Sequence, residues 1–452
     1  MKRYIIIFLL LIGLQSQGQR VLTLQECRDL AIDYNKSLQM AGVDAQKAQA
    51  NQKLARTAYL PALDGTASAT YLPSLDDIEI PGMFLPTADA DGNTTGDSEA
   101  YFPGLSLNTE KLSLYQAQLA LTIPIYAGGQ IRNANKMADL GVNMSQNALE
   151  LERDRVIQST DEAFWQLVAL EENIKVAKIY VAMMDSLEDQ LTTMYELGLS
   201  PKSEQLKVSV QKNDAELALL RANNGLSILK MRLCQLMGLP LQEDIRLDGQ
   251  LAENMPLPNM DNAWAKASIN RKELLIMEDQ IKIAELSKQN TAGEYKPTVG
   301  AQISYSYLNS PNLDFDSWNT MAVAQVSLPV FHWKERKHKL AAASLDQEKT
   351  KLEYDNSREL IQLEVSNLTI RVQEAYQTIV LAQKSCAQAQ ESLEEVALSY
   401  EAGLNTTTDL LNAQAAWQRA ESNKVEALTN LEIAKTAYQK GIGMLNSISA
   451  SN

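Results

Sequence analysis

The sequence predicts a mainly α-helical protein that also contains a β-barrel part and is built from two internal repeats. Two stretches of 67 residues, 130–196 and 335–401, contain no Pro, as expected of long helices. Residues 195–206 (YELGLSPKSEQL) return 205 positions later as residues 400–411 (YEAGLNTTTDLL). Short segments ahead of each long stretch alternate apolar and polar side chains, which is typical of amphipathic strands.

The first residues, MKRYIIIFLLLIGLQSQG, have the form of a secretory signal peptide. Lys2 and Arg3 are followed by the apolar run 5–14, which is too short to span a bilayer. Ser16 and Gly18 are small residues placed for cleavage near Gly18. We therefore expect residues 1–18 to be removed on export, with an uncleaved anchor as the alternative, and we expect no helical membrane span in the mature chain.

An internal duplication organises the chain. An offset of 205 residues pairs a proline and two glycines of the first half with the same residues in the second: Pro124 with Pro329, Gly198 with Gly403, and Gly238 with Gly443. Earlier in each half the offset is 236, because Pro61 aligns with Pro297. The extra 31 residues lie between Pro61 and Pro124, in a stretch rich in Pro, Gly and acid that predicts a long loop. The expected parts are a signal peptide (1–18), repeat 1 (19–238), an equatorial linker (239–261), repeat 2 (262–443) and a C-terminal tail (444–452).

Each repeat predicts a helix, two strands, a long helix, a turn and a shorter helix. The expected helices are 22–59, 130–196 and 202–237 in repeat 1, and 262–292, 335–401 and 406–441 in repeat 2. A helix of 67 residues would be roughly 100 Å long, so it needs partner helices along its length. Heptads in both long helices indicate left-handed coiled-coil packing, with one break at Glu188.

The strand segments 115–123 and 298–307 each present one apolar and one polar face. This pattern is typical of transmembrane barrel strands, although a strand on a soluble core gives the same pattern. Two strands per repeat make four per chain, which cannot close a barrel, and open sheet edges are not tolerated in lipid. A barrel would therefore need more than one chain. The aromatic residues near the strand ends would suit the membrane interfaces: Tyr71, Tyr126, Phe331 and Trp333.

The duplicated strand–Pro–long-helix plan and the doubled Tyr-x-x-Gly-Leu turn resemble the TolC-type outer-membrane efflux factor family. The resemblance implies a trimeric twelve-stranded outer-membrane barrel continued by a long periplasmic α-helical coiled-coil barrel. It also implies an exit duct of a tripartite efflux or type I secretion system, with a periplasmic adaptor and an inner-membrane pump of RND or ABC type as partners, and neither cofactor nor enzymatic activity. The net charge of −15 disfavours nucleic acid. A periplasmic coiled-coil scaffold or tether is the alternative, which explains the heptads but not the strands.

The doubled turn predicts helical-hairpin tips. Gly198 and Gly403 suit the left-handed residue that ends a helix, and Ser200-Pro201 and Asn405-Thr406 suit an N-cap followed by the first helical position. By resemblance, the adaptor would meet the turns (Gly198, Leu199, Ser200, Gly403, Leu404 and Asn405), and a periplasmic gate would use Glu204, Asp409, Tyr400 and Asn412. Asn405 and Asn412 stand where the family often has charged residues. The alternative for the two acids is stabilisation of the helix dipole.

Other candidate sites are weaker. His332 and His338 are six positions apart and do not share a helix face, so we predict a solvated basic helix start and no metal site. A bridge between Cys27 and Cys234 is conceivable, whereas Cys386 on the heptad seam is interpreted as a small apolar filler. The loop DADGNTTGDSE (89–99) lacks the spacing of a calcium loop, so we predict a flexible acidic loop, facing the cell exterior by the family plan.

Overall fold

The computed structural model describes residues 20–72, 78–88, 94–107, 112–253, 257, 259–311 and 314–445. The predicted signal peptide, residues 446–452 of the predicted tail and residues 89–93 of the acidic loop lie outside the described residues. The chain forms two compact units: Met1–Ala50, Leu140–Lys282 and Glu348–Asn452 make the first, and Asn51–Asp139 and Ile283–Gln347 make the second. Both repeats contribute to both units, because each long helix starts in the second unit and ends in the first.

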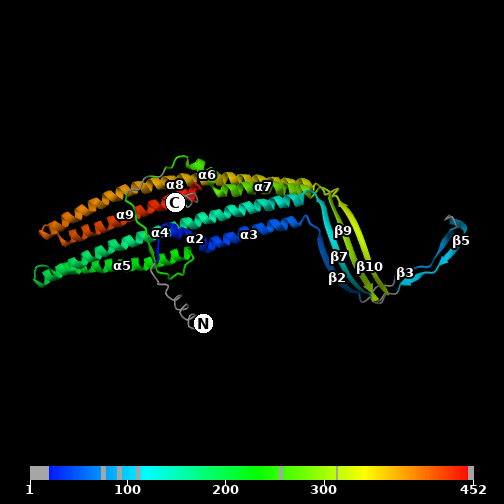
Figure 1. Ribbon diagram of the computed structural model, residues 1–452, viewed down its shortest axis with the longest axis horizontal. Helices are drawn as coiled ribbons and strands as arrows, with labels where there is room; N and C mark the ends of the chain where they lie inside the picture. The colour runs from blue at the N-terminus through cyan, green and yellow to red at the C-terminus, as the bar shows by residue number, and fades with distance from the viewer. Residues whose placement is uncertain are drawn as a thin grey trace, which may run out of the picture. The chain divides into compact units, whose positions relative to one another are not determined.

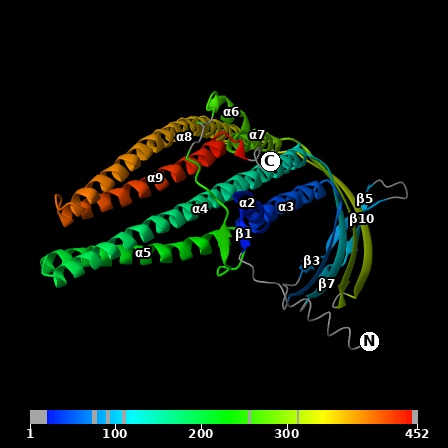
Figure 2. The ribbon, with the colours of Figure 1, turned by 60° about the vertical axis from the view of Figure 1, so that its left-hand side comes forward.

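Two helical hairpins form the greater part of the first unit (Figure 1). The long helices are α4 (Gln130–Glu196) and α8 (Glu335–Glu401), with the bounds that the sequence predicts. Each turns back into a helix of 35 residues, α5 (Lys202–Leu236) or α9 (Thr407–Gly441). Figure 2 shows α5 along α4 and α9 along α8. Heptad residues of the predicted seam are buried between them, among them Leu167, Met184 and Leu191 in α4 and Val372 and Ile379 in α8.

The predicted helices 22–59 and 262–292 are each broken in two, which corrects the expectation of continuous helices. The pieces are α2 (Leu24–Tyr34) and α3 (Lys36–Thr57) in repeat 1, and α6 (Ala263–Asn270) and α7 (Lys272–Gly293) in repeat 2. The breaks fall at Asn35 and Arg271, which both have extended backbones. Asn35 donates from Nδ2 to the carbonyl oxygen of Leu236 at 2.9 Å, and Arg271 donates to that of Gly441 at 3.3 Å. Each break therefore satisfies the last carbonyls of the returning helix.

The same junctions explain two of the repeated glycines. Gly238 and Gly443 follow α5 and α9, and each has φ 70°. A Cβ at Gly238 would lie 2.6 Å from the Cβ of Tyr34, and one at Gly443 would lie 2.8 Å from the backbone carbon of Asn270. Glycine is needed here both for its left-handed backbone and for the close approach.

The first unit also has a core beside its first described residues. The three-residue strand β1 (Arg20–Leu22) pairs in parallel with β8 (Ile245–Leu247). Cys27 and Cys234 lie in this apolar cluster with Phe164. Both cysteines are buried and neither is in a disulfide, so the conceivable bridge between them is not formed. Cys386 is buried on the seam as predicted, but its Sγ also donates to Glu421 Oε1 at 2.7 Å, so it is more than an apolar filler.

Two buried carboxylates of α4 lie where the repeats meet. Asp161 is fully buried and accepts from Arg28 of α2 at 2.7 and 2.6 Å and from Thr436 Oγ1 of α9 at 2.9 Å. This cluster ties the first short helix of repeat 1 to the last helix of repeat 2. Asp154 has no such partner: it is 6 % exposed, and its Oδ1 makes no hydrogen bond in the described part of the chain.

The environment of Asp154 raises the pKa of its carboxyl to about 6. Burial is the main cause, because an apolar environment disfavours the charged form, and the carboxylates of Glu150 on α4 and Glu273 on α7 add to the rise. The cations Lys440 of α9 and Arg153 of α4 act in the opposite direction.

The second unit is built on a four-stranded antiparallel sheet of order β10-β9-β7-β2. Its strands are β2 (Ala62–Leu72), β7 (Leu112–Ala127), β9 (Thr298–Ser310) and β10 (Phe315–Ser327), so the two central strands extend beyond the predicted segments. In register, Leu119 lies opposite Gly65 and Tyr305, and Gln118 lies opposite Thr66 and Ser306. The predicted alternation is confirmed, because apolar residues share one face and polar residues the other.

The interval expected to be a long loop contains further strands in its described part, which corrects that expectation. Strand β3 (Ile78–Ile80) pairs with β6 (Leu105–Leu107), and β4 (Met83–Ala88) pairs with β5 (Thr94–Phe102). Pro-Gly pairs at 81–82 and 103–104 separate the two ribbons. The two Pro-Gly pairs lie opposite each other in the two arms of the hairpin, so they interrupt strand pairing at one point and divide the hairpin into two ribbons. Among the described helices, none is both long and apolar enough to cross a bilayer.

Candidate functional site

The ends of the two helical hairpins have the same backbone geometry. Gly198 and Gly403 both have φ 72°, which confirms the prediction that a left-handed glycine ends each long helix. In repeat 1 the Gly198 amide donates to the Tyr195 carbonyl oxygen at 3.0 Å, and the Leu199 amide donates to that of Met194 at 2.8 Å. The matching pairs of repeat 2 have the same two distances: Gly403 to Tyr400 and Leu404 to Ser399. Both tips are therefore Schellman turns.

The turns expose apolar side chains. Leu199 is 74 % exposed and Leu404 is 80 % exposed, while Ser200 and Asn405 beside them are half-buried. The two leucines are equivalent under the 205-residue offset. An exposed apolar side chain at the same place on both tips suits contact with another protein.

The N-caps of the helices that leave the turns lie one residue later than predicted. The N-caps are Pro201 and Thr406, rather than Ser200 and Asn405. Thr406 forms a capping box with Asp409: its Oγ1 accepts from the Asp409 amide at 3.2 Å, and Asp409 Oδ2 accepts from the Thr406 amide at 2.9 Å. The Thr406 hydroxyl, followed by its amide, holds the pKa of Asp409 below its ordinary value. Asp409 thus has the capping role that the dipole interpretation anticipated.

Glu204 is equivalent to Asp409 but has different partners. Pro201 has neither a hydroxyl nor an N–H group, so it cannot form a capping box. The Glu204 carboxylate instead accepts from Lys207 Nζ at 2.7 Å. Lys207 is the main cause of the lowered pKa of Glu204, and a hydrogen bond from Thr407 lowers it further. Because Thr407 belongs to the other hairpin, Glu204 links the two tips.

The other two predicted gate residues lie in different surroundings. Tyr400 is half-buried and packs on an apolar cluster drawn from both hairpins, which includes Leu191, Val208, Leu393, Leu410 and Trp417. Asn412 is exposed, one turn beyond Asp409. The structure therefore brings Glu204 and Tyr400 to the interface between the hairpins, and leaves Asp409 and Asn412 on the exposed side of α9.

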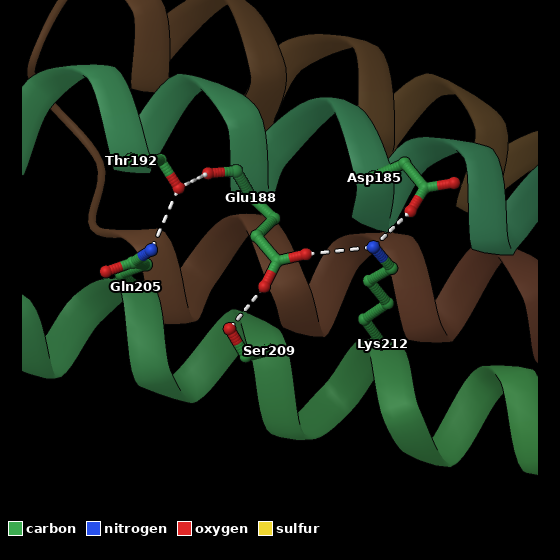
Figure 3. A network of polar contacts seen from close by, with 6 residues as sticks. All are labelled: Asp185, Glu188, Thr192, Gln205, Ser209 and Lys212. Carbon is green, nitrogen blue, oxygen red and sulfur yellow. Dashed lines mark hydrogen bonds and ion pairs between the residues drawn. The ribbon is translucent and has the colours of Figure 1, made fainter.

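A polar network inside the first hairpin was not identified from the sequence (Figure 3). Glu188 of α4 accepts a hydrogen bond from Ser209 and one from Lys212 Nζ at 2.9 Å, and Lys212 also contacts Asp185 at 2.7 Å. The bond from Ser209, followed by that from Lys212, lowers the pKa of Glu188. The signal for this network was the break in the heptad seam at Glu188, but its partners follow only from the pairing of α4 with α5.

The second hairpin replaces this network with apolar packing. The residues equivalent to Glu188 and Lys212 are Leu393 and Trp417, which are both buried. Gln205, which donates to Thr192 at 2.9 Å, corresponds to buried Leu410. The two hairpins thus have the same backbone geometry, but different side-chain interactions hold their helices together.

The family model described as outer membrane efflux protein matches residues 28–239 and 265–443. The chain belongs to the outer membrane efflux protein family. This efflux protein is also similar to solved outer membrane channels. The CmeC channel of Campylobacter jejuni is 16% identical, with a TM-score of 0.74 over 93% of this chain and 86% of that one. VceC of Vibrio cholerae is 16% identical (TM-score 0.71, 93% and 96%), and the open state of MtrE of Neisseria gonorrhoeae is 18% identical (TM-score 0.71, 93% and 89%). A search of curated protein sequences found no match.

Membership of the family confirms the recognition made from the doubled turn. The efflux protein has the mainly helical fold of the outer membrane channels, and its location is the outer membrane. The family consists of channel proteins rather than enzymes. Among the residues that the structure describes, no group of three His, Cys, Asp or Glu side chains is placed to hold a metal ion.

Proposed function

We propose that three copies of this efflux protein form an exit duct, in which a twelve-stranded barrel crosses the outer membrane and the helices continue it into the periplasm. The observation that carries the proposal is the open sheet: its edge strands β2 and β10 pair on one side only among the described strands. Unpaired backbone groups are not tolerated in lipid, so β10 of one chain must pair with β2 of the next. The exposed apolar face, with Leu63, Leu119 and Trp318, suits contact with acyl chains.

The helical part supports association of the same chains. Apolar residues on α5 remain exposed at steps of three, four, seven and eleven: Leu206, Val210, Leu217, Leu220 and Met231. A matching row on α8 has steps of eleven and seven: Leu352, Leu363, Ile370 and Leu381. Such spacings place the residues on one face of a helix. We infer that the α8 face of one chain packs on the α5 face of its neighbour, which would close the helices into a tube.

The mass of the purified protein in detergent tests this assembly. A trimer is expected, and a cysteine at Thr66 of β2 should cross-link to a cysteine on β10 of another chain in at least one register. A stable monomer would refute the duct. A trimer that conducts no ions in a planar bilayer would instead favour the scaffold or tether.

We propose that the hairpin tips form the periplasmic gate. Glu204 and Asp409 would bring up to six carboxylates near one aperture of the trimer, with Tyr400 and Asn412 beside them. Charge at a constriction attracts ions of the opposite sign. Glu204→Gln is expected to reduce cation preference in planar-bilayer recordings, and Asp409→Asn to reduce it further. If both variants keep the selectivity and only melt earlier, the acids are structural, as expected for Asp409 in its capping box.

We further propose that the turns dock a periplasmic adaptor, which connects the duct to an inner-membrane pump of RND or ABC type in an efflux or type I secretion system. The support is the exposure of Leu199 and Leu404 at equivalent places on both tips. Leu199→Asp with Leu404→Asp should leave the trimer and its conductance intact while abolishing export in cells. Export at the wild-type level would show that the adaptor binds elsewhere.

A further inference from the structure

Residues 330–339 comprise the end of the connection between β10 and α8 and the start of α8, and every one of them is exposed. Val330 is 87 % exposed, Phe331 69 % and Trp333 86 %. The rings of Phe331 and Trp333 contact each other, with centroids 5.0 Å apart. This segment, which we call the junction segment, therefore presents a compact aromatic and aliphatic surface to its surroundings.

The junction segment is also strongly basic. It contains Lys334, Arg336, Lys337 and Lys339 against one acid, Glu335, in a chain of net charge −15. Lys339 pairs with Glu335 at 2.8 Å and with Glu294 at 3.0 Å. Lys334, Arg336 and Lys337 form no ion pair with any residue that the structure describes. Arg336 and Lys337 lie in the first turn of α8, where the helix dipole disfavours positive charge, so the fold gives no reason for these two cations.

Comparison with repeat 1 shows that the segment departs from its equivalent. Trp333 and Lys334 have φ 41° and 67°, and the equivalent residues of repeat 1 are Gly128 and Gly129, with φ 62° and 89°. Left-handed backbone is unfavourable for Trp and Lys but not for Gly. Residues 129–134, equivalent to 334–339, contain a single cation, Arg132. Repeat 2 thus places a large aromatic and a cation where the backbone favours glycine, which points to a role outside the fold.

We propose that the junction segment anchors the protein to the surface of the inner leaflet of the outer membrane by binding the anionic headgroups of phospholipids. The proposal rests on the proposed function, because the sheet must cross the membrane for the segment to lie at its surface. Tryptophan and phenylalanine prefer the headgroup region, and clustered Lys and Arg are attracted to anionic lipid. Lys334, Arg336 and Lys337, which form no ion pair with a described residue, provide the complementary charge for phosphodiester groups.

The position of the segment within the second unit selects the leaflet. The segment lies at the end of the sheet where α3 ends, α7 ends and α4 begins, as Figure 1 shows. The β3–β6 and β4–β5 ribbons are inserted between β2 and β7 at the opposite end of those strands. The helical end of the sheet faces the periplasm in the proposed duct, so phospholipids of the inner leaflet, rather than lipid A of the outer leaflet, are the expected occupants.

Native mass spectrometry of the full-length protein with added lipid tests the anchor. Wild-type protein should retain phosphatidylglycerol in preference to phosphatidylcholine, and Lys334→Gln with Arg336→Gln and Lys337→Gln should reduce the retained phosphatidylglycerol by about fivefold or more. Trp333→Gly, which restores the residue of repeat 1, should weaken retention about threefold without loss of folding. Arg132→Gln with Lys136→Gln removes two exposed cations from the start of α4 in repeat 1 and serves as the control, with retention unchanged.

Three results would overturn the anchor: equal phosphatidylglycerol retention by wild type and triple variant, stronger retention of lipid A than of phosphatidylglycerol, or dissociation of the triple variant into monomers in neutral lipid. The last result would show that the segment is a contact between subunits. A monomeric wild-type chain that binds phosphatidylglycerol through these cations would refute the proposed duct and still support phospholipid binding by the junction segment. Failure of the duct can therefore be told apart from failure of the lipid anchor.

Discussion

The polar network of Figure 3 predicts how firmly the first hairpin is closed. Glu188→Gln removes the carboxylate that accepts from Ser209 and Lys212, while Lys212 keeps its contact with Asp185. The change is nearly isosteric, so it tests the charge of Glu188 rather than its packing. Asp189→Asn, on the neighbouring exposed position of α4, removes the same charge outside the network and is the matched control.

The size of the effect follows from the burial of the pair. A hydrogen bond to a charged group contributes about 1.5–3 kcal/mol when it is shielded from water. The side chains of Glu188 and Lys212 are 23% and 25% exposed, so solvent reduces the contribution of their bond. For the loss of the bonds from Lys212 and Ser209 together, we expect the stability of the hairpin to fall by about 1–3 kcal/mol. This is equivalent to roughly a 5- to 150-fold change in its opening equilibrium.

Amide hydrogen exchange measures this opening locally, because helical amides exchange when the hairpin opens. Amides of residues 204–212 should exchange roughly 5- to 150-fold faster in Glu188→Gln, whereas the equivalent amides of residues 409–417 should be unaffected, since Leu393 and Trp417 hold that hairpin. Equal exchange in Glu188→Gln and Asp189→Asn would refute the reasoning.

The same network gives a pH dependence with a defined sign. The pKa of Glu188 in the folded chain lies below its ordinary value of 4.5. Its stabilising contribution is therefore complete above pH 4.5 and is lost as the pH falls through the folded pKa. Protection of residues 204–212 should decrease under acid in the wild type and change less in Glu188→Gln.

Three further outcomes are expected. Asp161→Asn leaves Arg28 without its buried partner and should destabilise the protein by about 3–5 kcal/mol, seen as a lower melting temperature, whereas Thr436→Val should have a smaller effect. Asp154→Asn should raise the melting temperature at pH 7.5. The pKa of Asp154 is raised from 3.8 to about 6, so the native stability of the wild type falls by up to roughly 3 kcal/mol as the pH rises from 3.8 to about 6. A variant whose stability has the same pH profile as the wild type would contradict this. A protease added to intact cells should cut near residues 94–102 if the β4–β5 ribbon faces the exterior, and cleavage only after rupture of the outer membrane would reverse the orientation.

The long helices and the tips could be predicted because their determinants are local in sequence. Heptad spacing and the absence of Pro define α4 and α8, and a glycine is required wherever the backbone becomes left-handed, as at Gly198 and Gly403. The internal duplication then assigned the same plan to both halves. The interrupted hairpin at 78–107 was missed because Pro-Gly pairs are strong loop signals, and only pairing across the hairpin aligns its two interruptions.

The sequence by itself determined the periodic part of this protein: two repeats, their long helices, their turns and four amphipathic strands. These features also identified the chain as an outer membrane efflux protein. Only the tertiary structure decided which side chains meet. It gave Glu204 and Asp409 different partners, since Pro201 cannot form a capping box and Thr406 can. It also broke the short helices at Asn35 and Arg271, whose side chains donate hydrogen bonds to the last carbonyl oxygens of α5 and α9. Periodicity specifies the face on which a residue lies, whereas a hydrogen bond depends on positions that are brought together only when distant segments pack.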